Sequence, residues 1–185
     1  MLESLDKLCG LIEKEGFTHI AQTEGRTHSI REAFIIFSSP WCISQTKTVR
    51  IENEEPFLFS KKNVDEVLSR EQLQFEKIFR QKNEAEEGRG IHLLERKIIQ
   101  TKLNGYETAD PYGKTVQSAE LAIFMSLVPH DVERLTEHAI TKRFHLKQIT
   151  SHSLQIAFYT VMRDTFPQEN NFLFIDVNGE VTDVS

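Results

Sequence analysis

The sequence contains little of what crosslinked, membrane-spanning or strongly basic proteins require. Its 185 residues include two cysteines, Cys9 and Cys42, which make neither a disulfide framework nor a metal knuckle. Lysine and arginine number 22 against 28 aspartates and glutamates, a net charge of −6, which argues against a dedicated nucleic-acid binder. No apolar run approaches the roughly 20 residues of a membrane helix, and the acidic, amphipathic start differs from a signal peptide. We therefore expect a cytoplasmic protein.

What is present is enough apolar material for a folded core, with 39% hydrophobic residues and 13 phenylalanines. The Asn104-Gly105 dipeptide predicts a tight turn between two antiparallel strands, because both residues accept a positive φ. Helices and strands alternate after Pro129, which indicates a parallel βαβ unit. The predicted class is α+β. Apolar spacing predicts helices over 2–15, 61–80 and 130–143 and from Ser151, and strands over 17–20, 32–38, 42–51, 91–103, 115–128, 146–150 and 172–177.

The C-terminal segment holds the clearest candidate binding site. An apolar strand delivers Asp176 at its end, and Gly179 and Thr182 follow in a tight turn. A glycine lets backbone N–H groups approach a phosphate, a threonine hydroxyl donates to phosphate oxygens, and an aspartate holds Mg²⁺ through water. The alternative is an ordinary hairpin, because Asn178-Gly179 is by itself a good turn dipeptide, and spacing alone favours this alternative.

A second candidate is a protein-contact surface at the start of strand 42–51. Trp41 follows a Ser-Ser-Pro lead-in and marks a strand edge, and Ile43, Gln45 and Lys47 follow it along the strand. Adding a strand to an exposed edge is a common mode of peptide capture. The seven histidines, by contrast, form no metal-ligating pattern, and the carboxylates of the predicted helix 130–143 indicate a solvated face.

Three segments stand in a recognisable order: Leu103-Asn-Gly-Tyr106, Asp110-Pro-Tyr-Gly-Lys114 and Asp176-Val-Asn-Gly-Glu-Val-Thr-Asp183. In this order they resemble the FtsA/PilM branch of the actin-like ATPase superfamily. The last segment is similar to that family's second phosphate loop, Asp-hydrophobic-Gly-Gly-x-Thr-Thr-Asp, and the first two to its Leu-Asp-Gly and Asn-Pro-x-Gly stretches. The strand pair within 32–51 and the helix 61–80 resemble the strand-helix-strand-strand module that FtsA inserts into its first actin-like subdomain.

This resemblance implies an antiparallel sheet module with a packed helix, inserted in or joined to an actin-like, ribonuclease H-like βαβ half. It divides the chain into three parts. Residues 1–24 form a leading helix and linker, residues 25–129 the inserted module, and residues 130–185 a βαβ portion that ends in a phosphate-loop-like hairpin.

In such proteins ATP and magnesium lie between two phosphate loops, and Asp176, Gly179 and Thr182 match one of the two. Asn178 replaces the first glycine of that loop, and the other loop, with Asp-x-Gly-x-x-Ser/Thr, is absent. One loop alone offers a few hydrogen bonds, each worth about 0.5–1.5 kcal/mol net. We therefore expect that this chain by itself has no cofactor and neither binds nor hydrolyses ATP.

The leading functional hypothesis is a protein-interaction and assembly part of an FtsA- or PilM-like protein in cell division or pilus assembly. The partner implied is a filament protomer, an FtsZ-like protein or a pilus-assembly peptide, with no nucleic acid and only an indirect link to the inner face of the cell membrane. Two alternatives remain open: the core portion of a nucleotide-binding actin-like ATPase, and an unrelated α+β domain.

Overall fold

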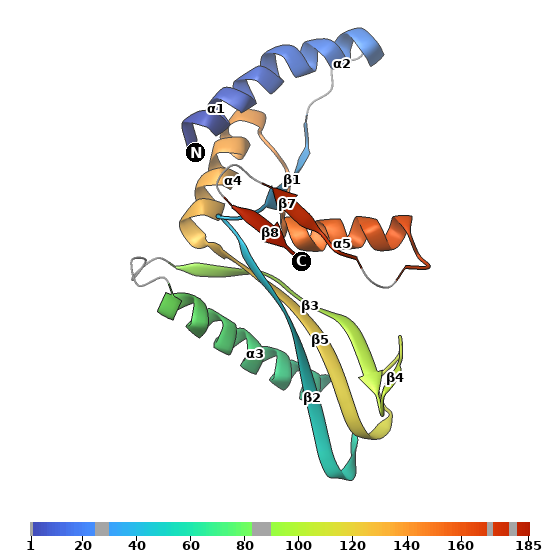
Figure 1. Cartoon of the computed structure of the whole chain (residues 1–185). Helices are drawn as coiled ribbons and strands as arrows, with labels where there is room; N and C mark the ends of the chain where they lie inside the picture. The colour runs from blue at the N-terminus through green and yellow to red at the C-terminus, as the bar shows by residue number, and fades with distance from the viewer. Residues whose placement is uncertain (1, 25–29, 83–89, 170–171, 178–180) are drawn as a thin grey trace.

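The computed structural model describes residues 2–24, 30–82, 90–169, 172–177 and 181–185 and shows an α+β fold, as the sequence predicted (Figure 1). The described strands form an antiparallel sheet in the order β2-β5-β3-β4, a parallel pair β1-β6 and an antiparallel hairpin β7-β8. The helices are α1 (Leu2–Leu11), α2 (Phe17–Glu24), α3 (Lys61–Lys82), α4 (His130–Phe144) and α5 (Leu154–Thr165), with a π-helical turn η1 (Ile12–Gly16) after α1. The strands are β1 (Glu32–Phe37), β2 (Ile43–Leu58), β3 (Ile91–Leu103), β4 (Tyr106–Glu107), β5 (Thr115–Pro129), β6 (Gln148–Ser153), β7 (Ile175–Val177) and β8 (Thr182–Val184).

The segment from β2 to β5, here called the antiparallel module, holds the larger core. Helix α3 lies across one face of its sheet (Figure 1). Ser60, just before this helix, accepts a hydrogen bond at its Oγ from the N–H of Asn63, at 3.3 Å, which fixes the start of the helix. Apolar residues at helical spacing on α3 then meet alternate residues of β5. They are Val64, Val67, Leu68 and Phe75 from α3 and Leu121, Ile123, Met125 and Leu127 from β5.

Strands β1 and β6 lie side by side in parallel, with Glu32 opposite Gln148 and Phe37 opposite Ser153. Two expectations from the sequence are thereby corrected. The strands within 32–51 do not pair with each other, and the described part of the parallel unit joins β6 to β1 rather than to β7. The reason is a sharp turn between β1 and β2, where the N–H of Trp41 donates to the carbonyl of Ser38 at 2.9 Å and sends β2 away from β1.

The N-terminal region is helical for longer than its sequence indicated. The predicted strand 17–20 is wrong, because the chain continues through η1 into α2. The helix predicted over 2–15 continues past Gly16, since the backbone stays right-handed at Phe17. The ring of Phe17 packs edge-on against Phe144 of α4, with ring centroids 6.2 Å apart, so a tertiary contact favours the helix here.

Other boundaries differ in length. Strand β2 extends beyond the predicted end at residue 51 to Leu58, and its register on β5 shifts between Glu52 and Phe57. The predicted strand 172–177 is reduced to β7, and the helix predicted from Ser151 begins at Leu154. The Asn104-Gly105 turn is confirmed, with φ of 50° and 85°. In the described part of the chain, no helix has the length and apolar character to cross a membrane.

Candidate functional site

A hollow of about 420 Å³ lies where the first turn of α5, the strand β8 and the start of β2 meet. It is called the α5 hollow below. Hydroxyl, amide and carboxylate groups share this small space with the ring of Phe124 from β5. Its lining residues are Ser39, Ile43, Ser44, Gln45, Thr46, Phe124, Gln155, Asp183, Val184 and Ser185.

Gln155 is the most distinctive residue of the α5 hollow. It is 9% exposed, and its Oε1 atom is buried with no hydrogen-bond partner among the described residues. Its Nε2 atom lies 3.5 Å from Oδ2 of Asp183, at the outer limit of a hydrogen bond. A buried amide oxygen without a partner costs about 1–3 kcal/mol. The hollow therefore presents an unsatisfied acceptor beside a carboxylate, an arrangement that suits a donor or a cation.

The predicted phosphate-loop residues lie in and around the β7-β8 hairpin. Asp176 on β7 is directly opposite Asp183 on β8, and Thr182 is opposite Val177. Because successive residues of a strand point to opposite faces, Asp176 shares a face with Asp183 and Thr182 lies on the other. The hairpin thus brings together two carboxylates and separates Thr182 from them. Gly179 and Asn178 lie outside the described residues.

The sequence reasoning missed two residues of this site. They are Asp183, which closes the phosphate-loop-like motif, and Gln155 in the first turn of α5. The sequence could have indicated Gln155 in one way. It is a polar residue at an inward position in the first turn of a helix whose other inward positions are apolar. That signal is weak, since glutamine is common on helix surfaces.

The thiol of Cys42 is affected by the negative charges near the α5 hollow. It is almost fully buried, and burial together with the negative charges of Glu95 and Asp183 raises the pKa of its thiol to about 12. Negative charges therefore converge on this thiol from β3 and from β8. A neutral, buried thiol serves as a small apolar residue rather than as a nucleophile.

The predicted contact residues divide into two groups. Trp41 is 43% exposed, just before β2. Ile43 packs on the module's core, and Nζ of Lys47 contacts Glu71 and Gln74 of α3. Gln45 lines the α5 hollow. Of the four predicted contact residues, Trp41 is therefore the exposed one, whereas Ile43, Gln45 and Lys47 contact other parts of the chain.

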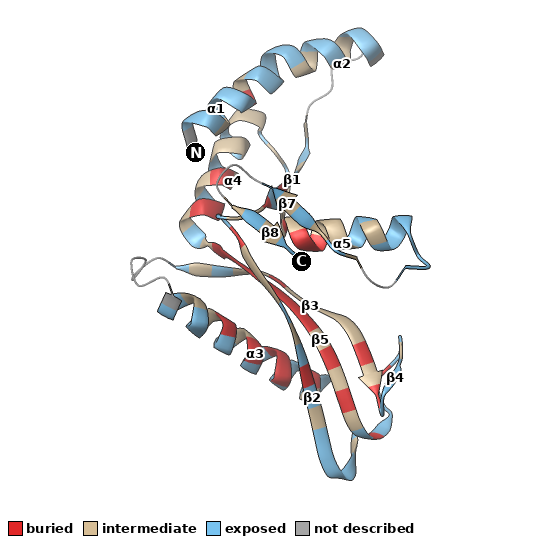
Figure 2. Ribbon diagram, in the orientation of Figure 1, coloured by how far each residue is buried: buried red, intermediate tan, exposed pale blue. Residues whose placement is uncertain are grey.

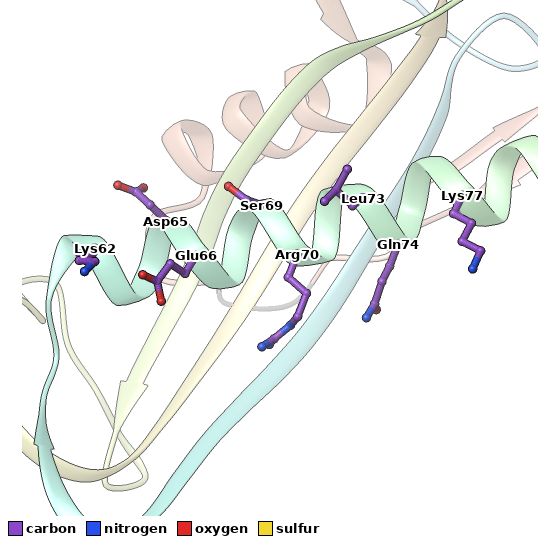
Figure 3. Close-up of a pocket in the computed structure, with 8 residues that line it drawn as sticks. All are labelled: Lys62, Asp65, Glu66, Ser69, Arg70, Leu73, Gln74 and Lys77. Atoms are coloured by element: carbon purple, nitrogen blue, oxygen red, sulfur yellow. The ribbon is translucent and has the colours of Figure 1, made fainter.

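A larger but shallow depression of about 860 Å³ covers the outer face of α3 (Figure 3). Figure 3 shows that all its labelled side chains come from this one helix. Side chains on a single helix face do not converge on a common point, and their charges are of mixed sign. We interpret this surface as the solvated face of α3. The lining residues are Lys62, Asp65, Glu66, Ser69, Arg70, Leu73, Gln74 and Lys77.

Within the described ranges, no three His, Cys, Asp or Glu side chains gather closely enough to hold a metal ion. Asp176 and Asp183 could share a cation only with a further ligand such as the Gln155 amide oxygen. Searches of protein-family models and of curated protein sequences give no match to this chain.

Proposed function

We propose that this chain is the interaction and assembly part of an FtsA- or PilM-like protein of the actin family, and that it takes up a strand at the free edge of β2. The observation that carries the proposal is the pairing of β2. From Ile43 to Glu52 this strand pairs with β5, and it has no second neighbouring strand among the described residues. Its outer backbone N–H and C=O groups are therefore available to an added strand.

The side chains of β2 indicate how a partner would be held. Thr46, Thr48 and Arg50 lie exposed on the face away from α3, and Figure 2 shows most of β2 exposed where β5 is buried. Backbone hydrogen bonds along the edge would give affinity, and these polar side chains would select the partner. Trp41 at the end of the same strand offers an apolar anchor, because an indole combines a large apolar area with one N–H donor.

The partner that the family resemblance favours is a filament protomer, an FtsZ-like division protein or a pilus-assembly peptide. The same resemblance implies a cytoplasmic protein that reaches the inner face of the membrane only through partners or further sequence. The acidic balance of the chain agrees with this, because it disfavours direct docking on anionic lipid. The chain is not proposed to be an enzyme by itself.

The experiment that tests this proposal is sedimentation velocity over a wide concentration range, with fluorescence of the single tryptophan recorded on the same samples. We expect a rise of the sedimentation coefficient with concentration and a blue shift of Trp41 emission as the edge is covered. Replacing Thr46 and Thr48 by lysine should abolish both, because charged edge residues oppose strand addition. Ser69→Lys on the exposed face of α3 is the control and should change neither.

Concentration-independent sedimentation would exclude self-assembly. The edge would then need a different chain, tested by titrating a peptide of alternating Thr and Val residues against Trp41 emission. No response to either would contradict the proposal.

A second function, the core portion of a nucleotide-binding ATPase, is favoured by one observation, the unsatisfied Gln155 oxygen beside Asp183. These groups would hold magnesium, which in turn neutralises the phosphates of ATP, and the hairpin backbone would position the phosphates. The test is the melting temperature with and without magnesium-ATP. A rise of the melting temperature that is absent in Gln155→Ala would support this function. An unchanged melting temperature would contradict it, and only the interaction function would remain.

A further inference from the structure

We propose that Glu95 is a positioning residue, the joint through which the antiparallel module fixes Gln155 in the α5 hollow. This proposal rests on the proposed function, because Glu95 links the antiparallel module, which contains the β2 edge, to the α5 hollow. Glu95 belongs to β3 and is 6% exposed. It lies where the pairing of β3 with β5 shifts register, between Leu93 and Glu95, and this irregularity allows its side chain to be aimed at β6.

The carboxylate of Glu95 receives four contacts from two different elements. The Oγ of Ser126 on β5 donates to Oε2. On β6, the Oγ of Ser153 donates to Oε2 at 2.6 Å, the N–H of Ser153 donates to Oε1 at 3.0 Å, and Nδ1 of His152 lies 3.0 Å from Oε1. A carboxylate that accepts several hydrogen bonds is held in one orientation, and charge-assisted bonds are the stronger kind.

Ser153 is the residue through which Glu95 positions the start of α5. It is fully buried, and it is the N-cap residue of α5, yet its hydroxyl makes no capping bond to the helix. A serine in this place ordinarily accepts a bond from the first turn. Here the hydroxyl and the N–H both face Glu95 instead. The start of α5 is therefore tied to β3 of the antiparallel module.

Gln155 stands two residues after Ser153 in the first turn of α5, and within the described ranges its amide oxygen has no hydrogen-bond partner. Its one described hydrogen bond, to Asp183, is 3.5 Å long. Fixing Ser153 therefore fixes the direction in which the Gln155 amide enters the hollow. Removing the Glu95 carboxylate should free this first turn while the apolar core of the module stays intact, because that core is built from α3 and the opposite face of the sheet.

The test compares Glu95→Gln with Glu71→Gln in the full 185-residue chain. Glu71 is the matched control, because the side chains of Glu71 and Glu95 are equally buried, at 4% exposure, but the partners of Glu71 are Lys47 and Arg70 and not Ser153. The readouts are backbone hydrogen exchange over residues 153–156 and the side-chain amide signals of Gln155 in ¹H–¹⁵N spectra, identified by their loss in Gln155→Glu.

We expect Glu95→Gln to accelerate exchange at residues 153–156 about tenfold and to move the Gln155 amide signals toward those of a solvated glutamine. Glu71→Gln should lower the denaturation midpoint without changing either readout. Unchanged readouts in Glu95→Gln, or equal changes in both variants, would overturn the proposal. If Glu95→Gln does not fold, Ser153→Ala removes one of the four contacts and should show the same changes at smaller size; a Ser153→Ala protein with wild-type readouts would also overturn it.

These readouts require neither assembly nor a ligand. Sedimentation tests the proposal about the β2 edge, whereas hydrogen exchange at the start of α5 tests the proposal about Glu95. The failure of one can therefore be distinguished from the failure of the other.

Discussion

Lys47 on β2 and Glu71 on α3 form an ion pair, with Nζ of the lysine 2.5 Å from Oε2 of the glutamate. Arg70 approaches the other oxygen at 3.2 Å. The glutamate is buried and the two cations are partly exposed. The edge strand proposed to receive a partner is therefore attached to the helix behind it, midway along its paired segment from Ile43 to Glu52.

Glu71→Gln should lower the free energy of unfolding by about 1–2 kcal/mol, since it removes charge-assisted hydrogen bonds to a buried group while keeping the side-chain shape. Chemical denaturation monitored by circular dichroism measures the change. Glu66→Gln, at an exposed position of the same helix, is the control and should cost less than about 0.5 kcal/mol. Equal losses in the two variants would show that burial of this pair is unimportant.

The same pair predicts a pH dependence. Burial alone would raise the pKa of Glu71, but hydrogen bonds from Lys47 and Arg70 outweigh it and hold the pKa below its ordinary value of 4.5. A carboxylate with a lowered pKa in the folded state stabilises the fold above its unfolded pKa, and this contribution is lost as pH falls through the folded pKa. The stability difference between the wild type and Glu71→Gln should therefore be constant near neutral pH and shrink below pH 4.5. A difference that persists into strong acid would contradict this.

Glu120 on β5 is a half-buried counterpart, lying between the more exposed Arg50 and Lys102 on the sheet face away from α3. The hydrogen bond from Arg50 is the main cause that lowers its pKa. Arg50→Met should raise the pKa of Glu120 toward its ordinary value, as measured by NMR titration of the carboxyl carbon. Added salt should have a similar effect in the wild type, because exposed charges are screened. A pKa insensitive to both changes would show that this contact does not persist in solution.

The Asn104-Gly105 turn gives a prediction about the backbone. Gly105 has a φ of 85°, and the Oδ1 atom of Asn104 accepts hydrogen bonds from the N–H groups of Gln117 and Ser118. Gly105→Ala should cost about 1 kcal/mol of stability, because a residue with a Cβ is strained at this φ. Gly16→Ala is the control and should be neutral or stabilising, because Gly16 has a helical conformation and an added Cβ would lie 3.6 Å from Cγ2 of Ile12, an ordinary van der Waals contact. Equal effects would mean that the turn relaxes without cost.

The antiparallel module could be predicted from the sequence because its signals are local. The Asn104-Gly105 turn, the alternation along β5 and the apolar stripe of α3 each specify an element and the face it buries. The pairing of β1 with β6 could not be predicted in this way, since more than 100 residues separate Glu32 from its partner Gln148 and parallel pairing leaves no turn signal between them. The misassigned strand 17–20 failed for a similar reason, because the contact of Phe17 with Phe144 is a tertiary one.

The candidate site was predictable in part. Asp176 was predicted as a site residue from its place at the end of an apolar segment, and the structure pairs it with Asp183 in the β7-β8 hairpin. Gln155 and Glu95 were not found, because their significance comes from burial and from contacts between distant strands. Strand β3 has mixed polarity, so nothing in its sequence indicates that Glu95 is buried against Ser153.

The thiol of Cys42 offers a direct test of the charges that meet beneath the α5 hollow. With its pKa raised to about 12, by burial first and then by Glu95 and Asp183, Cys42 should react with iodoacetamide far more slowly than a free thiol at pH 9. Asp183→Asn removes one negative charge that disfavours the thiolate, so the pKa should fall and alkylation at pH 9 should become faster. Peptide mapping by mass spectrometry separates Cys42 from Cys9.

Asp176→Asn is the matched control for this experiment. It neutralises the carboxylate directly opposite Asp183 in the same hairpin, but it is not among the charges that act on Cys42. The rate of Cys42 alkylation should therefore stay at the wild-type value in Asp176→Asn and rise in Asp183→Asn. Equal rates in all three proteins would show that Asp183 does not approach the thiol in solution, and the α5 hollow would then lack the carboxylate that its proposed cation requires.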